Sequence, residues 1–212
     1  MFPLRDLNSI DSNERGRRGR RAIVVLLVKP SDGIADQLIG NFNYYHFASR
    51  GHCSIYAAGY GLGATETYGD AKKVCTVDGC DWWYSDRCFV EFQNQLSLRT
   101  KWRYCGEPEI LILQTGKGKH SSLDFTNYVA IDVCQGLRQG YIDAVPRLME
   151  GLLQASKEEV EAKSLIKEAT RLSASNIAKS AIDICLDFVH CPASLKTVLA
   201  DRAFYRTSNR RS

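Results

Sequence analysis

Two glycine-rich stretches contain the residue types that could hold a phosphate. The first is GYGLG, residues 59–63, and the second is TGKGKHSS, residues 115–122. Glycine lets backbone N–H groups approach an anion closely, lysine adds positive charge, and the start of a helix adds free N–H groups. Neither stretch has the spacing of a P-loop or of the dinucleotide fingerprint G-x-G-x-x-G. The candidate ligand-binding residues are Gly59, Gly61, Gly63, Gly116, Lys117, Gly118, Lys119 and Ser121.

Acidic residues and a histidine near these stretches could act on a bound ligand. A carboxylate beside a ribose can serve as a general base or stabilise an oxocarbenium-like centre. Glu66 has no evident structural role and is the first catalytic candidate, followed by His120 and Asp32. Asp32 and Asp124 also fit as helix N-caps, which is the favoured interpretation of both. The sequence leaves open whether the protein is an enzyme.

Eight cysteines raise the question of zinc or disulfide bonds. Only Cys75 and Cys80 are closely spaced, whereas zinc ligands usually come as two close pairs. We therefore predict no metal site and expect reduced thiols, as in a reducing compartment. A zinc module built on Cys75, Cys80 and Cys88 is kept as a lesser alternative.

The hydrophobic pattern indicates the elements that must position these residues. Largely apolar runs at 22–29, 53–58 and 110–113 are typical of strands that are buried on both faces. A helical pattern over 33–46 separates the first two runs, and this order is typical of an α/β fold. A hairpin is expected around Asp78 and Gly79.

Right-handed crossovers between such strands would give a small, mainly parallel Rossmann-like sheet flanked by helices. In open sheets of this kind, ligands bind beyond the carboxyl ends of the strands. The loops at 29–32, 59–66 and 115–122 would then share one border of the sheet and form one pocket.

Helical patterns dominate the rest of the chain. Ser85 fits as the N-cap of a helix that buries Phe89, Phe92 and Leu96. From Ser121 onward the apolar spacing predicts a helical C-terminal half. The expected organisation is a flexible basic arm (1–21), an α/β sheet domain (22–122), a helical part packed on it (123–205) and a basic tail (206–212).

The charge distribution suggests binding partners. The net charge of +4 is modest, but arginines are concentrated in the first arm, which could attract the phosphates of a nucleotide or a nucleic acid without reading base sequence. These residues are Arg15, Arg17, Arg18, Arg20 and Arg21. The helical half could bind a protein partner or form an oligomer. The longest apolar run, 22–28, is too short to span a membrane, and no secretory signal is recognised, so we expect a cytoplasmic protein.

The runs FNYYHFASRGHCSIYAAGYG and RTKWRYCGEPEILIL resemble small bacterial α/β proteins that are encoded beside anti-phage defence genes. The resemblance covers residues 22–115 and implies a cytoplasmic effector or accessory subunit. It assigns a role to no individual residue.

Two functional hypotheses follow from the sequence. The first is an intracellular α/β domain that binds a nucleotide-like or phosphate-bearing ligand at the strand-end loops, as an effector or accessory protein of defence that cleaves this ligand through Glu66 and His120. The second is a non-catalytic subunit that binds nucleic acid or a protein through the arginine arm and the helical half.

Overall fold

The computed structural model describes residues 1–14, 22–51, 53–63, 69–114, 123–140, 142–158 and 205–207. The helices are α1 (Leu7–Glu14), α2 (Ala35–Ile39), α3 (Phe42–Ala48), α4 (Asp86–Arg99), α5 (Val133–Arg138) and α6 (Val145–Glu158). The strands are β1 (Phe2–Leu4), β2 (Ala22–Leu27), β3 (Ser54–Ala58), β4 (Tyr60–Leu62), β5 (Lys72–Val77), β6 (Cys80–Tyr84), β7 (Glu109–Gln114), β8 (Asp124–Asp132) and β9 (Tyr205–Thr207).

A six-stranded mixed sheet in the order β1-β3-β2-β7-β8-β9 forms the centre of the molecule. The strands β1, β3 and β2 are parallel, whereas β7, β8 and β9 each run antiparallel to the preceding neighbour in the sheet. Val25 of β2 lies opposite Tyr56 of β3 on one side and Leu111 of β7 on the other. The predicted mainly parallel Rossmann-like sheet is therefore wrong.

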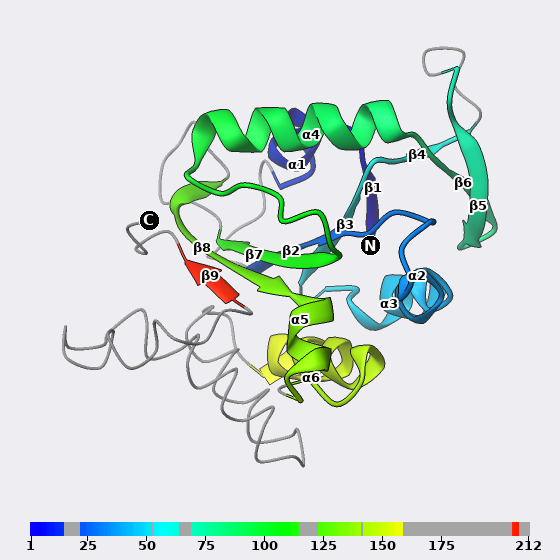
Figure 1. The fold of residues 1–212 in the computed structure, drawn as a ribbon. Helices are drawn as coiled ribbons and strands as arrows, with labels where there is room; N and C mark the ends of the chain where they lie inside the picture. Colours follow the sequence, from blue (N-terminus) through cyan, green and yellow to red (C-terminus); the bar gives the residue numbers. More distant parts are fainter. Residues whose placement is uncertain are drawn as a thin grey trace, which may run out of the picture.

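The path of the chain explains why β7 is antiparallel to β2. After β3 the chain builds β4, β5 and β6, follows α4, and then runs back along this helix before β7 begins (Figure 1). It therefore enters β7 at the border where β2 ends, with Leu27 opposite Glu109. The apolar runs correctly indicated strands that are buried on both faces, but burial says nothing about strand direction.

Helices cover both faces of the sheet. Figure 1 shows α4 with α1 on one face and α5 with α6 on the other, and α2 contacts α6. The side chains of Phe89, Phe92 and Leu96 are fully buried beneath α4, as predicted. The Oγ of Ser85 accepts a hydrogen bond from the backbone N–H of Cys88 at 3.1 Å, which confirms the predicted N-cap.

A second, three-stranded sheet in the order β4-β6-β5 contains the predicted hairpin. Asp78 and Gly79 have φ angles of 50° and 74°, as a two-residue turn of the type favoured in hairpins requires. The ring of Trp82 in β6 lies 5.8 Å from that of Phe42 in α3, and Phe42 also packs against Tyr60 of β4. This aromatic cluster joins the small sheet to α3.

The predicted helical C-terminal half is wrong over β8. Phe125, Val129 and Val133 are four residues apart, and this spacing places residues on one side of a strand as well as on one side of a helix. In the structure Phe125 and Val129 belong to β8, which pairs with β7. The helix predicted around Val145 and Leu152 is present as α6, while residues 159–204 lie outside the described part of the chain.

The helix expected over 33–46 is divided into α2 and α3 at Gly40 and Asn41. The predicted flexible arm is wrong for residues 1–14, which form β1 and α1 and bury Leu4, Leu7 and Ile10 completely. Its arginines, in 15–21, lie outside the described residues. Among the described residues, no helix is both long enough and apolar enough to cross a bilayer.

Candidate functional site

The three parallel strands β1, β3 and β2 end at the same border of the sheet, because Leu4 pairs with Ala58 and Leu26 pairs with Ala57. The segments that follow these strands therefore begin side by side: Arg5 after β1, residues 59–63 after β3, and residues 29–32 after β2. Ligands of open α/β sheets commonly bind at this border.

The strand that leads into the second glycine-rich stretch ends elsewhere. Ala22, the first residue of β2, pairs with Gln114, the last residue of β7. The prediction that all three loops start at one border is therefore wrong. The residues Gly116, Lys117, Gly118, Lys119 and Ser121, with the catalytic candidates Glu66 and His120, lie outside the described residues.

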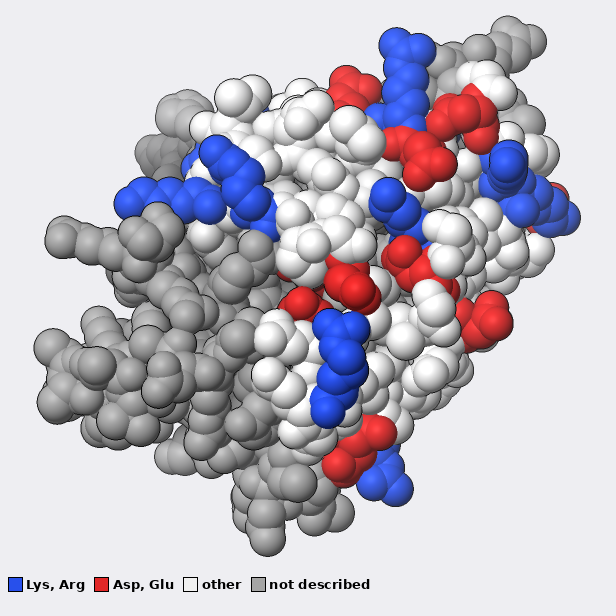
Figure 2. Space-filling model, viewed as in Figure 1, with Lys and Arg blue, Asp and Glu red and all other residues white. Residues whose placement is uncertain are grey.

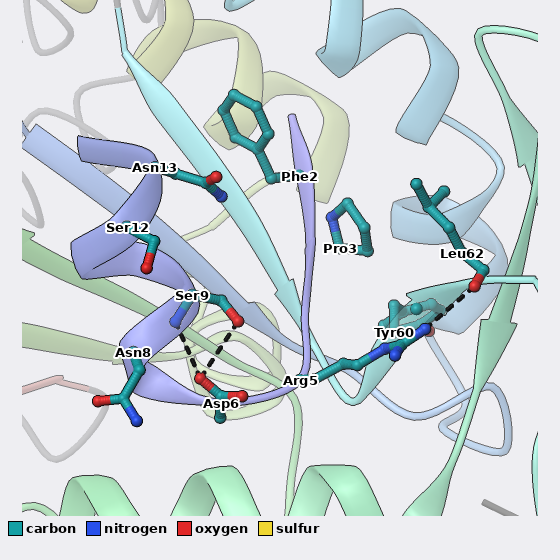
Figure 3. Close-up of a pocket in the computed structure, with 11 residues that line it drawn as sticks. Phe2, Pro3, Arg5, Asp6, Asn8, Ser9, Ser12, Asn13, Tyr60 and Leu62 are labelled. Carbon is teal, nitrogen blue, oxygen red and sulfur yellow. Dashed lines mark hydrogen bonds between the residues drawn. The ribbon is translucent and has the colours of Figure 1, made fainter. Parts of the chain in front are cut away.

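A pocket of about 570 Å³ extends along the edge strand β1 and reaches this border at Arg5 (Figure 3). One wall is β1 with the turn after it, a second is the outer face of α1, and the third is β4. Arg5 and Asp6 lie at one end of the pocket, and Phe2 and Asn13 at the other.

Arg5 is the positively charged residue of the pocket wall. Its guanidinium lies against Gly61, where a Cβ atom would come within 2.6 Å of Arg5 Nε. One Nη2–H donates to the backbone carbonyl of Leu62 at 3.0 Å, and the guanidinium makes no other hydrogen bond within the described chain. Gly61, a predicted ligand-binding residue, thus lies in the pocket because it makes room for the arginine.

Asp6 begins α1. Its Oδ1 accepts hydrogen bonds from the backbone N–H and the Oγ–H of Ser9, at 2.9 and 3.2 Å. This is N-cap geometry, which satisfies one of the free N–H groups at the start of the helix. Within the described residues Oδ2 accepts no hydrogen bond. The carboxylate therefore contributes an acceptor to the pocket.

The remaining wall is uncharged. Asn8, Ser12 and Asn13 are exposed on the outer face of α1, opposite the buried Leu7 and Ile10. Amides and hydroxyls both donate and accept hydrogen bonds, so this face suits a ligand with several hydroxyl or amide groups.

A half-buried ring closes the other end of the pocket. Phe2 stacks on Tyr56 with the ring centroids 5.3 Å apart and an angle of 30° between the planes. Tyr56 is fully buried and fixed by a hydrogen bond of 2.7 Å to Glu14. Tyr56 is thus a rigid support for the Phe2 ring.

The other two glycines of the first stretch have structural explanations. Gly59 has a φ of 84°, and a Cβ atom there would lie 2.8 Å from Tyr84 and 2.9 Å from Phe89. Its N–H donates to the carbonyl of Leu4, and its own carbonyl accepts from the N–H of Ser85. Gly63 is exposed with a φ of 74°. Close packing and turn geometry thus account for glycine at positions 59 and 63.

Asp32, the described catalytic candidate, lies in a turn that closes on itself. Its Oδ2 accepts a hydrogen bond of 2.6 Å from the N–H of Lys29, and its own N–H donates to the carbonyl of Lys29. The predicted role as a helix N-cap is wrong, because Ile34 occupies that position and no side chain caps α2. Asp124, the other predicted N-cap, is the first residue of β8.

Burial raises the pKa of Asp32 above its ordinary value. The N–H and charge of Lys29 oppose this shift, whereas the nearby carboxylates of Glu107 and Asp86 add to it. The Lys29 ammonium lies over the ring of Phe89, 5.3 Å from its centroid. Raised carboxyl pKa values are common among catalytic acids, but the bonds of Asp32 are those of a structural turn.

The cysteines do not assemble a metal site in the described part of the chain, where no cluster of three or more His, Cys, Asp or Glu side chains could hold an ion. Cys75 is half-buried in β5, Cys80 is exposed in β6, and Cys88 is buried in α4. The zinc module considered from the sequence has no geometric support there.

Sequence reasoning missed the pocket because residues 1–14 were assigned to a flexible arm. A signal was available: Asp6 and Ser9 have the spacing of a helix N-cap and its N3 position. Leu7 and Ile10 follow at helical spacing.

No protein-family model, curated protein or solved structure matches the chain. The resemblance to proteins encoded beside defence genes stays a prediction. Function must therefore be inferred from the geometry of the pocket and the chemistry of its side chains.

Proposed function

We propose that the protein binds a small phosphate-bearing ligand, such as a nucleotide, in the pocket between β1, α1 and β4. Arg5 is the anchor for the phosphate. The proposal rests on the position and bonding of the Arg5 guanidinium. It lies in the pocket wall, at the border where three parallel strands end. Among the described residues, it donates one hydrogen bond to the protein itself.

The chemistry of arginine favours this ligand class. The planar guanidinium has five N–H donors in a fork that matches two oxygens of a phosphate. Gly61 supports one face of the fork, and the bond to the Leu62 carbonyl fixes its direction. An anchor that is already ordered loses little conformational entropy when it binds.

The dimensions of the pocket suit a ligand of this size. Small-molecule sites typically enclose about 300–1,000 Å³ and combine an apolar surface with a few placed polar groups. The pocket of about 570 Å³ offers Phe2 and Pro3 as apolar surface, and Arg5, Asp6 and Asn13 as polar groups. Cleavage of the ligand by Glu66 and His120 is a separate prediction.

The alternative function, nucleic-acid binding, has less support from the described surface. Nucleic-acid interfaces carry positive charge clustered on one face. On the face seen in Figure 2, the Lys and Arg side chains of the described residues are interspersed with Asp and Glu. The arginines proposed for this role lie outside the described residues.

The decisive experiment compares Arg5→Ala with Arg147→Ala by isothermal titration with inorganic phosphate and the four ribonucleoside 5′-monophosphates. Arg147 is an exposed arginine of α6, on the other face of the sheet, so its variant controls for net charge. We expect Arg5→Ala to weaken binding at least about tenfold, since a hydrogen bond to a charged group contributes roughly 1.5–3 kcal/mol. Arg147→Ala should bind like the wild type.

Circular dichroism of both variants checks the fold. Two results would refute the proposal: a wild type that binds none of these ligands at millimolar concentration, or an Arg5→Ala variant that binds them as tightly as Arg147→Ala.

A further inference from the structure

The pocket follows an edge of the central sheet. Within the described chain β1 is the end strand of this sheet, with β3 as its neighbour. The pocket extends along β1 between α1 and β4 (Figure 3). An end strand presents backbone N–H and C=O groups that can pair with another chain. The backbone of β1 is therefore part of what the pocket offers to a ligand.

Two backbone groups of this edge point away from β3. The C=O of Leu4 accepts from the N–H of Gly59 at 2.9 Å, on the β3 side. Because the peptide unit is trans, the N–H of Arg5 points in the opposite direction. In the parallel ladder the N–H of Leu4 also faces β3, so the C=O of Pro3 points outward in the same way. Neither outward group has a hydrogen-bond partner among the described residues.

The neighbouring positions limit how far this edge can pair. Pro3 has no N–H to donate. The next outward carbonyl, that of Met1, lies 3.1 Å from Nδ1 of His46 and is bonded to it. One acceptor and one donor therefore remain, the C=O of Pro3 and the N–H of Arg5. They match a short stretch of extended peptide, which supplies one N–H and one C=O in return.

The side chain of Arg5 determines where a phosphate on such a peptide would bind. Side chains that lie opposite each other on neighbouring strands share one face. The peptide residue opposite Arg5 would thus direct its side chain to the side where the guanidinium lies against Gly61. Asp6 extends to the other side of β1 (Figure 3), so its carboxylate does not face a phosphate bound there.

We propose that the phosphate is carried by an extended peptide with a phosphoserine or phosphothreonine, which adds to the edge of β1 while its phosphate binds Arg5. The inference rests on the proposed function and names the class of molecule that carries the phosphate. A nucleotide has no extended backbone that could pair with both Pro3 and Arg5, whereas a peptide strand uses both groups and the guanidinium together.

A defined peptide tests the inference, because main-chain pairing does not depend on the flanking side chains. The probe is the pentapeptide TVSVT with acetylated and amidated ends and a phosphorylated serine. One control is the same peptide without the phosphate, and the other is acetyl-phosphoserine amide, which lacks the flanking residues. We expect isothermal titration to show that the phosphopeptide binds at least about tenfold more tightly than either control.

Methylation of single peptide nitrogens identifies the strand pairing. One peptide N–H donates to the C=O of Pro3. It belongs to the valine before the phosphoserine if the added strand is parallel to β1, and to the last threonine if it is antiparallel. We expect methylation of that nitrogen to weaken binding at least about threefold, through the loss of one hydrogen bond. Methylation of the other four nitrogens should leave the affinity unchanged.

Three results would overturn the inference. The first is equal affinity for the phosphopeptide and for acetyl-phosphoserine amide, and the second is equal affinity for the peptide without phosphate. The third is a methylation series without a single sensitive nitrogen. If Arg5→Ala still weakened the binding of inorganic phosphate in these cases while Arg147→Ala did not, the phosphate proposal would stand without the peptide.

Discussion

The segments that follow β1 and β2 leave the sheet at the same border, yet they use similar side chains in opposite ways. After β2, the carboxylate of Asp32 accepts from the N–H of Lys29, and the Lys29 ammonium lies over Phe89. After β1, Arg5 and Asp6 each use part of their hydrogen-bonding capacity for the protein, and the rest faces a pocket.

The difference shows that a strand end does not by itself make a binding site. A polar group that is already paired would have to break a hydrogen bond before it bound a ligand, which costs about 0.5–1.5 kcal/mol for each neutral bond. The unused donors of Arg5 and the Oδ2 of Asp6 carry no such cost. The segment after β1 is therefore the better candidate site, although no motif in its sequence points to ligand binding.

The largest predicted effect comes from a substitution at Gly59, which contacts residues next to both segments. The N–H of Gly59 bonds to Leu4, just before Arg5, and the position of its missing Cβ faces Phe89, which lies beneath Lys29. Gly59→Ala combines a strained φ with overpacking, so it should reduce the free energy of unfolding by about 2–4 kcal/mol. Urea denaturation measures the loss.

Gly63→Ala is the matched control. Its φ of 74° is similar, but nothing lies within 4 Å of the added methyl group. We expect a loss of about 1 kcal/mol from the backbone conformation alone. Equal losses in both variants would show that close packing around Gly59 does not join the two segments.

The next prediction concerns the hydrogen bond that links Tyr60 in β4 to the end of β2. Tyr60 is one of the residues that line the pocket, but its side chain is fully buried. Its hydroxyl donates to the carbonyl of Val28 at 3.2 Å, at the end of β2. Tyr60→Phe keeps the ring and removes one buried hydrogen bond, so stability should fall by about 1 kcal/mol. The dissociation constant for phosphate ligands should not change. A weaker affinity would mean that the segment after β2 contributes to binding after all.

The sequence predicts those parts of the fold that have local causes. The turn at Asp78 and Gly79 favours a hairpin by its own backbone preferences, and Ser85 caps α4 through a residue three positions away. Continuous apolar runs identify β2, β3 and β7 because burial on both faces requires them. These elements are all present.

The errors concern long-range arrangement. The direction of β7 depends on the route of the chain through β4, β5, β6 and α4, which no local pattern records. Phe125 and Val129 fit a helix and a strand equally, and only pairing with β7 decides between them. At the candidate site, Gly61 was predicted from its residue type, but Arg5 lies beside it only because β1 joins the sheet beside β3.

The smallest predicted effect tests whether the segment after β2 is structural. Because burial raises the pKa of Asp32 in the folded protein above its unfolded value of about 3.9, the ionised form is less favourable in the folded state. The stabilising effect of the protonated carboxyl is fully present below the unfolded pKa and is lost as the pH rises through the folded pKa.

Asp32→Asn keeps an oxygen that can accept from Lys29 and removes the charge. It should therefore increase the free energy of unfolding at pH 7 by less than about 1 kcal/mol, because the site is partly open to solvent. Thermal denaturation should show this as a slightly higher melting temperature at pH 7 and as no difference from the wild type near pH 3. A variant that is less stable than the wild type at neutral pH would instead indicate that the negative charge pairs favourably with Lys29, and that this segment is held by the ion pair rather than by the turn.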